Sequence, residues 1–284
     1  MLGVLALAGC CFWGENENGP VSAVSPDGRN EIRLWTSPLA YEVARDGVVV
    51  VAKTEIGMTV DGTCLAPRAE CLVREEAKSG SVETPVYKKA KVDLSGNETV
   101  AAFGDWGVRL AARNDGVAYR FETKRAGRVR IDGERASVAV PDAEATCSFG
   151  YGHDIGCEET VPVGCPAKEI ETGKEKARSH IYLPFVYSVD GKWVAVTESD
   201  VCDYPVWNLT RTAKDGAATL DATFAGWPTD TCHVSNGKDW SKRVEQKTGG
   251  RWVKVRASAD YLVETEGTRT FPWRTFVLGD SPSA

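Results

Sequence analysis

Apolar and polar residues alternate along much of this 284-residue chain. Ile32 and Leu34 alternate with charged residues, and the apolar side chains of Val108, Leu110 and Ala112 are separated by single residues. Because successive side chains of a strand point to opposite faces, this alternation predicts strands with one buried face. The run 193–196 is continuously apolar, which predicts a strand buried on both faces.

Turn signals separate these segments. They are Asp46-Gly47, Asn114-Asp115-Gly116, Asp190-Gly191, Asp215-Gly216 and Gly249-Gly250. An Asp-Gly or Asn-Gly pair supplies the positive φ angles of a tight hairpin, so the signals predict antiparallel neighbours. Only Ala66 to Ser79 has a helical composition. The pattern therefore predicts an all-β fold, a large antiparallel β-sandwich.

Composition narrows the class of protein. The chain is 42% hydrophobic and 26% charged, which is typical of a soluble globular protein. Its length allows one large all-β domain or two smaller ones. The net charge is −6 and the basic residues are scattered among acids, so we expect no nucleic-acid partner. No apolar run approaches the roughly 20 residues that span a bilayer.

The N-terminus contains a candidate export signal. Leu2 to Ala8 is apolar, and Leu7-Ala8-Gly9-Cys10 resembles the lipobox of bacterial lipoproteins. The resemblance implies that residues 1–20 are a signal and tether, that Cys10 is lipidated, and that the protein is exported as a periplasmic or outer-membrane-anchored lipoprotein. The membrane would then be contacted only through the lipid. No basic residue precedes the apolar run, unlike an ordinary secretory signal. The alternative is a buried or frayed N-terminal strand.

Nine cysteines fit an exported protein, because disulfides persist in oxidising compartments. The close pairs Cys64/Cys71 and Cys157/Cys165 could staple loops, although sequence alone does not fix the connectivity. A zinc site is disfavoured, because there is no C-x-x-C pair and the three histidines lack ligand spacing.

Five segments, in order, resemble the N-terminal β-sandwich domain of glycoside hydrolase family 97, a bacterial family of exo-acting α-glucosidases and α-galactosidases. They are SPDGRNEIRL (25–34), RNDGVAYRF (113–121), SHIYLPFVYSVDGKWVAVTES (179–199), VAVTESDVCDYPVW (194–207) and FPWRTFVLGDSP (271–282). The resemblance implies a galactose-mutarotase-like supersandwich over residues 21–284. Residues 144–176 match no family motif. The family's catalytic (β/α)8 barrel, about 250 residues, has no counterpart in this chain.

The resemblance implies a non-catalytic accessory domain that packs on such a barrel and contributes one calcium ligand. Its partner would be an α-glucoside or α-galactoside bound through the barrel, and we expect the chain to be inactive alone, so its status as an enzyme stays open. The alternative is a free-standing carbohydrate-binding or structural surface lipoprotein. An accessory domain should expose apolar surface that meets the barrel, whereas an independent domain should not.

The resemblance assigns the calcium ligand to Glu198, in TESD. Calcium takes about six to eight oxygens, so one carboxylate should bind it weakly. The alternative is a solvated strand-end carboxylate, and we expect Glu198 to contribute little to stability. Asp203 and Tyr204 would shape a loop that faces the barrel and substrate, or else Tyr204 is core and Asp203 caps a turn. For Trp273-Arg274 we expect an indole in the core and a guanidinium paired with an acid.

No catalytic residue is assigned in this chain. Glu158 and Glu159 are adjacent, so on a strand they would point to opposite faces, unlike the carboxyl pair of a glycoside hydrolase. Trp207, Trp227 and Trp240 lie in polar, turn-rich segments, and one or two are candidates for exposed rings that stack on sugars.

Overall fold

The fold is described by a computed structural model over residues 13–15, 19–67, 71–84, 90–152, 162–172, 180–212, 218–236, 243–246 and 252–282. Within these ranges it consists of strands and a single 3-10 turn, η1 (Ala167–Glu169), so the all-β prediction is confirmed. The predictions for Cys10, Cys157, Asp215-Gly216, Trp240 and Gly249-Gly250 fall outside the described residues. None of the described residues forms a helix long and apolar enough to cross a membrane.

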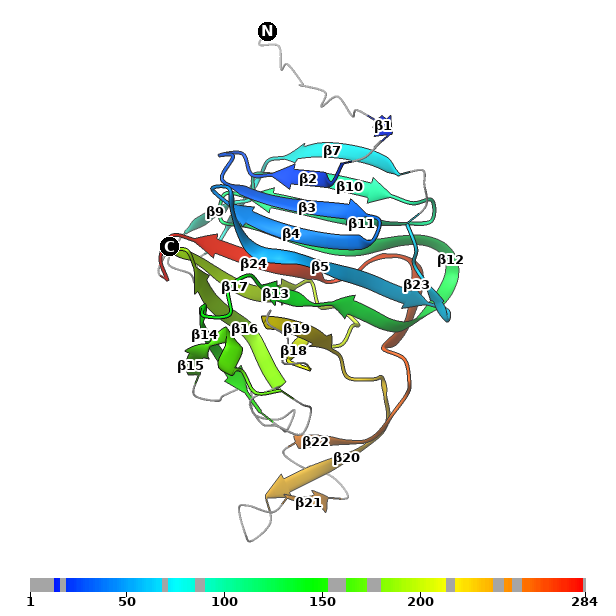
Figure 1. Cartoon of the computed structure of the whole chain (residues 1–284). Coiled ribbons are helices and arrows are strands. Elements are labelled where there is room, and N and C mark those ends of the chain that lie inside the picture. The colour runs from blue at the N-terminus through cyan, green and yellow to red at the C-terminus, as the bar shows by residue number, and fades with distance from the viewer. Residues whose placement is uncertain are drawn as a thin grey trace.

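The larger of two stacked layers is a long antiparallel sheet (Figure 1). Its strands run in the order β1 (Trp13–Glu15), β7 (Leu72–Lys78), β10 (Gly96–Ala102), β11 (Trp106–Arg113), β12 (Gly116–Ala136), β24 (Trp273–Gly279), β17 (Lys192–Ser199), β16 (His180–Val189), β14 (Thr146–Tyr151) and β15 (Val163–Pro166).

The second layer consists of β2 (Val21–Val24), β3 (Asn30–Thr36), β4 (Leu39–Arg45) and β5 (Val48–Val60). β5 also pairs with the second half of β12, while the first half of β12 lies in the larger layer. Because β5 and β12 link the two layers, the network of hydrogen-bonded strands closes on itself. This network also includes β13 (Val138–Val140), β18 (Asn208–Thr210), β19 (Ala218–Thr223) and β23 (Val263–Thr270). Short pairings are added by β6 (Thr63–Cys64), β8 (Ser81–Glu83) and β9 (Lys91–Asp93).

One hydrophobic core lies between the layers, as the alternating pattern predicts. Ile32 and Leu34 of β3 and Val108, Leu110 and Ala112 of β11 are all fully buried. Aromatic rings fill the middle, where Tyr41 of β4 lies 4.8 Å from Tyr119 of β12 between ring centroids. The buried hydroxyl of Tyr41 donates to the carbonyl oxygen of Ser137 at 2.8 Å, so this polar group is satisfied inside the core.

Two of the predicted Asp-Gly turns have the backbone that a tight hairpin requires. Asp46 and Gly47, between β4 and β5, have φ angles of 51° and 79°, and Asp190 and Gly191, between β16 and β17, have 48° and 72°. Glycine adopts such angles without steric cost, which explains the Asp-Gly pairs at these positions.

Two local expectations are wrong. Residues 72–78, within the segment of helical composition, form strand β7 between β1 and β10, because pairing on both edges overrides the weak helical propensity. The run 193–196 is not buried on both faces. Val194 and Val196 are fully buried, whereas Trp193 and Ala195 are partly exposed on the outer face of the sheet.

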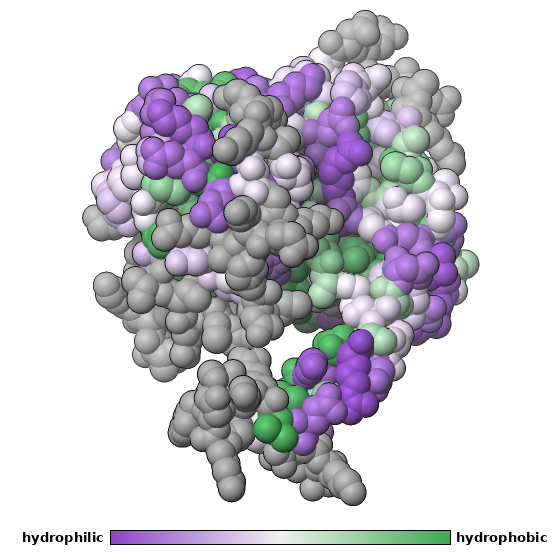
Figure 2. Space-filling model, turned by 60° about the horizontal axis from the view of Figure 1, so that its bottom comes forward, coloured by the Kyte–Doolittle hydropathy of each residue, from purple (hydrophilic) through white to green (hydrophobic). Residues whose placement is uncertain are grey.

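A separate three-stranded arm projects from the sandwich, at the bottom of Figure 1. It consists of β20 (Pro228–Asn236), β21 (Arg243–Gln246) and β22 (Trp252–Ser258), in the order β21-β20-β22. Val244, Val253 and Val255 of the arm are exposed. Seen from below, hydrophobic and strongly hydrophilic residues lie side by side on this arm (Figure 2).

Candidate functional site

Glu198 belongs to a buried cluster of polar side chains, which we define as Glu134, Glu198, Tyr204, Trp207 and Arg274. Strand pairing assembles the cluster, because β17 places Glu198 directly opposite Arg274 of β24, and β12 supplies Glu134 from the other side. The side chains of Arg274, Glu134 and Glu198 are 1%, 2% and 9% exposed. The expected solvated strand-end carboxylate is therefore wrong.

The Arg274 guanidinium binds both carboxylates. Its Nε donates to Glu134 Oε1 at 2.9 Å and its Nη2 donates to Glu134 Oε2 at 2.7 Å, so Glu134 is bound in a bidentate manner. The Nη1 of Arg274 donates to Glu198 Oε2 at 2.6 Å. The backbone N–H of Trp207 donates to Glu198 Oε1 at 2.9 Å, and the Tyr204 hydroxyl donates to Glu134 Oε2 at 2.8 Å.

Aromatic rings surround the same guanidinium. Its carbon lies 5.1 Å from the ring centroids of Trp207 and Phe224, and 5.9 Å from that of Tyr204. Arg274 thus combines cation–π contacts with ion pairs, as suits a buried arginine. The expectation that Arg274 pairs with an acid is confirmed, and it pairs with two.

The buried cluster carries one more carboxylate than cationic groups. Burial alone would lower the pKa of Arg274, but the charge and hydrogen bonds of Glu134 outweigh it and the pKa is raised. For Glu198, burial raises the pKa above its ordinary value, and the Trp207 N–H and the Arg274 guanidinium offset this only in part. Glu198 is also the most exposed of the three charged members.

Asp203, Tyr204 and Trp273, the other residues singled out from the sequence, differ from one another in burial. Asp203 is exposed in a bend with a left-handed φ of 47°. Tyr204 is core, with its ring edge-on to Phe224 and Phe271, so the core alternative holds for it. Trp273 is half-buried on the outer face, stacked 4.3 Å from the Arg120 guanidinium, so the expected core position is wrong.

The tryptophans expected in polar segments also differ from one another. Trp207 is fully buried, because the loop that contains it folds back onto Glu198, whereas Trp227 is 43% exposed. Trp227 remains a candidate for sugar contact.

Glu198 can supply one metal ligand, but the residues that the structure describes do not supply a complete set of ligands. No group of three or more His, Cys, Asp or Glu side chains able to hold a metal is found in the described part of the chain. An ionised carboxylate has about four acceptor positions, and Glu198 uses two of them on Arg274 and Trp207. Its remaining capacity fits a role as a single ligand to an ion held mainly by other groups.

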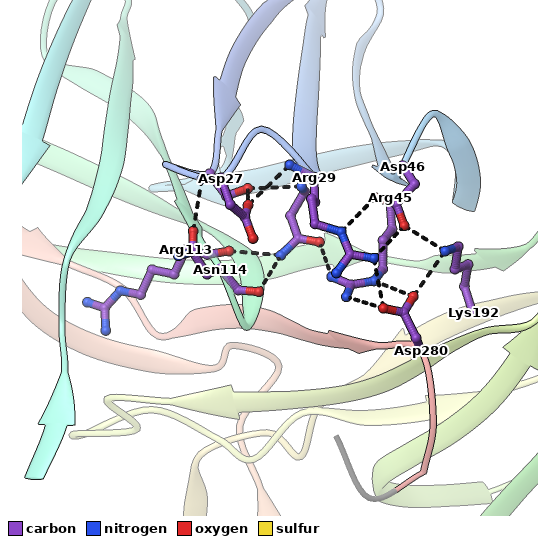
Figure 3. Close-up of polar contacts among 10 residues, drawn as sticks. Asp27, Arg29, Arg45, Asp46, Arg113, Asn114, Lys192 and Asp280 are labelled. Carbon is purple, nitrogen blue, oxygen red and sulfur yellow. Dashed lines mark hydrogen bonds and ion pairs between the residues drawn. The ribbon is translucent and has the colours of Figure 1, made fainter.

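A second group of charges, which we call the surface ion cluster, comprises Arg29, Arg45, Asp46, Lys192 and Asp280 (Figure 3). Asp280, just after β24, accepts from Arg29 Nη2 at 2.7 Å, from Arg45 Nη2 at 3.0 Å and from Lys192 Nζ at 3.0 Å. Asp46 accepts from Arg29 Nη2 at 2.8 Å and from Lys192 Nζ at 2.6 Å.

These contacts explain several sequence motifs. The side-chain amide of Asn30 donates to the backbone carbonyls of Arg113 and Asn114, and the Asp27 N–H donates to Asn114 Oδ1. The segments SPDGRN, RNDG, DGK and LGD therefore meet at one end of the sandwich (Figure 3). Their side chains hold the turns and strand ends together at this end of the sandwich.

Sequence reasoning missed Glu134. It follows a β-bulge at Ile131/Gly133, where the simple alternation of β12 is interrupted. The sequence signal is a lone glutamate in the stretch RVRIDGERASV, and nothing local shows that it faces inward.

Fold and site together define an all-β sandwich domain whose interior holds an arginine between two carboxylates. The family model for the glycosyl-hydrolase 97 N-terminal domain matches residues 23–284, so the chain belongs to this family.

Known proteins resemble this chain over nearly all of its length. A retaining α-galactosidase of Bacteroides thetaiotaomicron is 26% identical over 263 residues, covering 89% of this chain and 38% of that protein. A glycoside hydrolase family 97 enzyme from Pseudoalteromonas sp. strain K8, solved with acarbose, aligns with a TM-score of 0.70 at 18% identity, covering 92% of this chain and 36% of that one. A β-arabinopyranosidase structure aligns with a TM-score of 0.68 at 15% identity, covering 92% and 40%. The chain thus spans little more than a third of the relatives it matches.

Proposed function

We propose that this chain is the non-catalytic N-terminal domain of an exo-acting family-97 α-galactosidase or α-glucosidase, and that it packs on a catalytic (β/α)8 barrel and contributes Glu198 as one ligand to a calcium ion there. The observation that carries the proposal is the surplus carboxylate of the buried cluster. A buried net negative charge is costly unless a cation or a proton compensates it.

The chain's own residues orient this ligand. Glu134 fixes the Arg274 guanidinium at two points, and Arg274 and the Trp207 N–H then hold one oxygen of Glu198 each. When bound, a calcium ion would supply positive charge close to a sugar substrate. Glu198 would reach it with its unused acceptor positions, without a change in the contacts that hold it.

Exposed apolar residues next to Glu198 support packing against a further domain. Val201 and Val206, in the loop that follows β17, are 38% and 52% exposed. An accessory domain is expected to expose such surface where it meets the barrel, whereas an independent domain would have polar residues there. The α-galactoside or α-glucoside would bind at the barrel, and export as a lipoprotein anchored through Cys10 is part of the same proposal.

A chimera tests the calcium role. The N-terminal region of the Bacteroides thetaiotaomicron relative is replaced by this chain, and hydrolysis of p-nitrophenyl α-galactoside is measured against calcium concentration. We expect Glu198→Gln to raise the calcium concentration for half-maximal activity by roughly tenfold or more, because the metal loses a direct ligand. The matched control is Glu144→Gln, which alters an exposed ion pair with Lys168.

The isolated chain provides the second measurement. Calorimetry should show no micromolar calcium binding, and no hydrolysis of the same substrate is expected. Tight calcium binding by the isolated chain, or an equal calcium requirement in the Glu198→Gln and Glu144→Gln chimeras, would refute the proposal.

A further inference from the structure

Two cysteines face each other across the hairpin at the edge of the larger layer. Strand β14 places Cys147 directly opposite Cys165 of β15. Residues directly opposite in an antiparallel pair share a face of the sheet and have Cα atoms about 4.5–5.5 Å apart. Disulfides form at Cα separations of about 4.4–6.8 Å, so the backbone already has the required spacing.

The surroundings place both sulfur atoms on the core side. Cys147 is fully buried, and Cys165 is partly buried and packs against the same hydrophobic core. Burial raises the pKa of the Cys147 thiol to about 12, and the neighbouring Cys165 adds to this shift.

Hydrogen bonds hold the hairpin just beyond the cysteine pair. The Ala167 N–H donates to the Ala145 carbonyl at 2.9 Å. The buried Arg211 side chain donates from Nη1 to the carbonyl oxygens of Ala167, Lys168 and Ile170, at 3.1, 2.8 and 3.2 Å. These bonds fix the backbone two residues from both cysteines, so the thiols are kept at a high effective concentration.

We propose that Cys147 and Cys165 form a cross-strand disulfide when the folded chain meets a disulfide oxidant such as oxidised glutathione. The half-exposed Cys165, as thiolate, attacks the oxidant, which forms a mixed disulfide and releases one thiol. Cys147 loses its proton, and its sulfur attacks the Cys165 sulfur and releases the second thiol. Two protein thiols are oxidised, and one small disulfide is reduced to two thiols.

The other pairs suggested by sequence lack this arrangement or fall outside the described residues. Cys64 lies opposite Thr59 in the pairing of β5 with β6, and Cys71 precedes β7. Cys64 and Cys71 are therefore not cross-strand partners. Cys157, the sequence-based partner of Cys165, is outside the described residues, so the experiment must separate it from Cys147.

Two proteases separate the three cysteines. Cleavage after glutamate and before aspartate gives peptides 145–153 with Cys147, 154–158 with Cys157 and 160–169 with Cys165. The full-length chain is oxidised with oxidised glutathione, alkylated, digested without reductant and analysed by mass spectrometry. We expect a linked pair of peptides 145–153 and 160–169, and a roughly tenfold loss of both free peptides relative to a reduced sample, since structural disulfides strongly resist reduction by glutathione.

Variants identify the partner. Cys157→Ser should keep the link, and reductant should lower its melting temperature, whereas Cys147→Ser should lose the link and show a melting temperature that does not depend on reductant. A link between peptides 154–158 and 160–169 would overturn the proposal, as would free peptides that are equally abundant with and without reductant. Because the peptide map is read on the unmodified chain, a variant that fails to fold does not prevent the test.

Discussion

Arg274 connects three parts of the sequence through one guanidinium. Glu134 lies 140 positions before it and Glu198 lies 76 positions before it, yet both carboxylates are within hydrogen-bonding distance. The rings of Trp207 and Phe224 also depend on this charge for their cation–π contacts. The residue therefore serves stability and the orientation of Glu198 together.

Removal of the Arg274 guanidinium should strongly lower the free energy of unfolding. Arg274→Met leaves two buried carboxylates without a cationic partner, and such a change typically costs about 3–5 kcal/mol. Urea unfolding followed by tryptophan fluorescence measures the loss. Arg135→Met, which breaks the exposed pair with Glu55, is the control and should cost at most about 1 kcal/mol. Equal losses in the two variants would show that the buried cluster contributes no special stability.

The raised pKa of Glu198 predicts a pH dependence of stability. In the unfolded chain the Glu198 carboxyl has a pKa of about 4.3. As the pH rises from there to the raised pKa of the folded protein, the unfolded state ionises first, so the free energy of unfolding falls. Asp46 and Asp280 act in the opposite sense. Their pKa values are depressed by hydrogen bonds from arginine and lysine, so their contribution is present above about pH 3.9 and is lost as pH falls.

Glu198→Gln isolates the first effect. Urea midpoints between pH 4 and pH 7 should show wild type losing stability relative to the variant as pH rises, because only wild type has the Glu198 carboxyl to ionise. Parallel curves for the two proteins would mean that Glu198 keeps an ordinary pKa.

At the scale of single elements, alternation located the buried faces correctly. A strand's inward residues are set by its own sequence period, which is why positions 108–112 were assigned from pattern alone. Partners across strands leave no such local mark. Glu134 lies beyond a bulge, and the burial of Glu198 and Trp207 depends on the register of β24 and on the fold of a loop. Residues 72–78 became a strand because two neighbouring strands pair with them.

Gly116, in the NDG motif, lies where β12 and β24 approach each other closely. A Cβ atom on Gly116 would lie 2.3 Å from the Phe276 carbonyl oxygen of β24. Gly116→Ala should therefore displace the pairing of β12 with β24 and cost about 1–3 kcal/mol, as overpacking usually does. Gly133→Ala is a matched control in the same strand, because a Cβ there meets nothing within 4 Å. Thermal melting compares the two, and an equal effect would contradict the steric explanation.

At the scale of the whole molecule, two clusters of charged side chains join segments that are distant in sequence. The surface ion cluster connects the turns before β3 and after β4, and the first residue of β17, to the residue that follows β24. The buried cluster connects β12, β17 and β24 in the interior. Together they hold β24 near its start, at Arg274, and just beyond its end, at Asp280.

Strand β12 has a consequence for how the protein folds. Its 21 residues pair with β11 and β24 in one layer and with β5 in the other, so neither layer is complete without it. The two layers cannot separate as independent folding units, and the pairings of β12 with β5 and β24 and of β17 with β24 join segments distant in sequence. Folding should therefore be slow and all-or-none, and the backbone amides in the middle of β12 should exchange with solvent only when the entire sandwich opens.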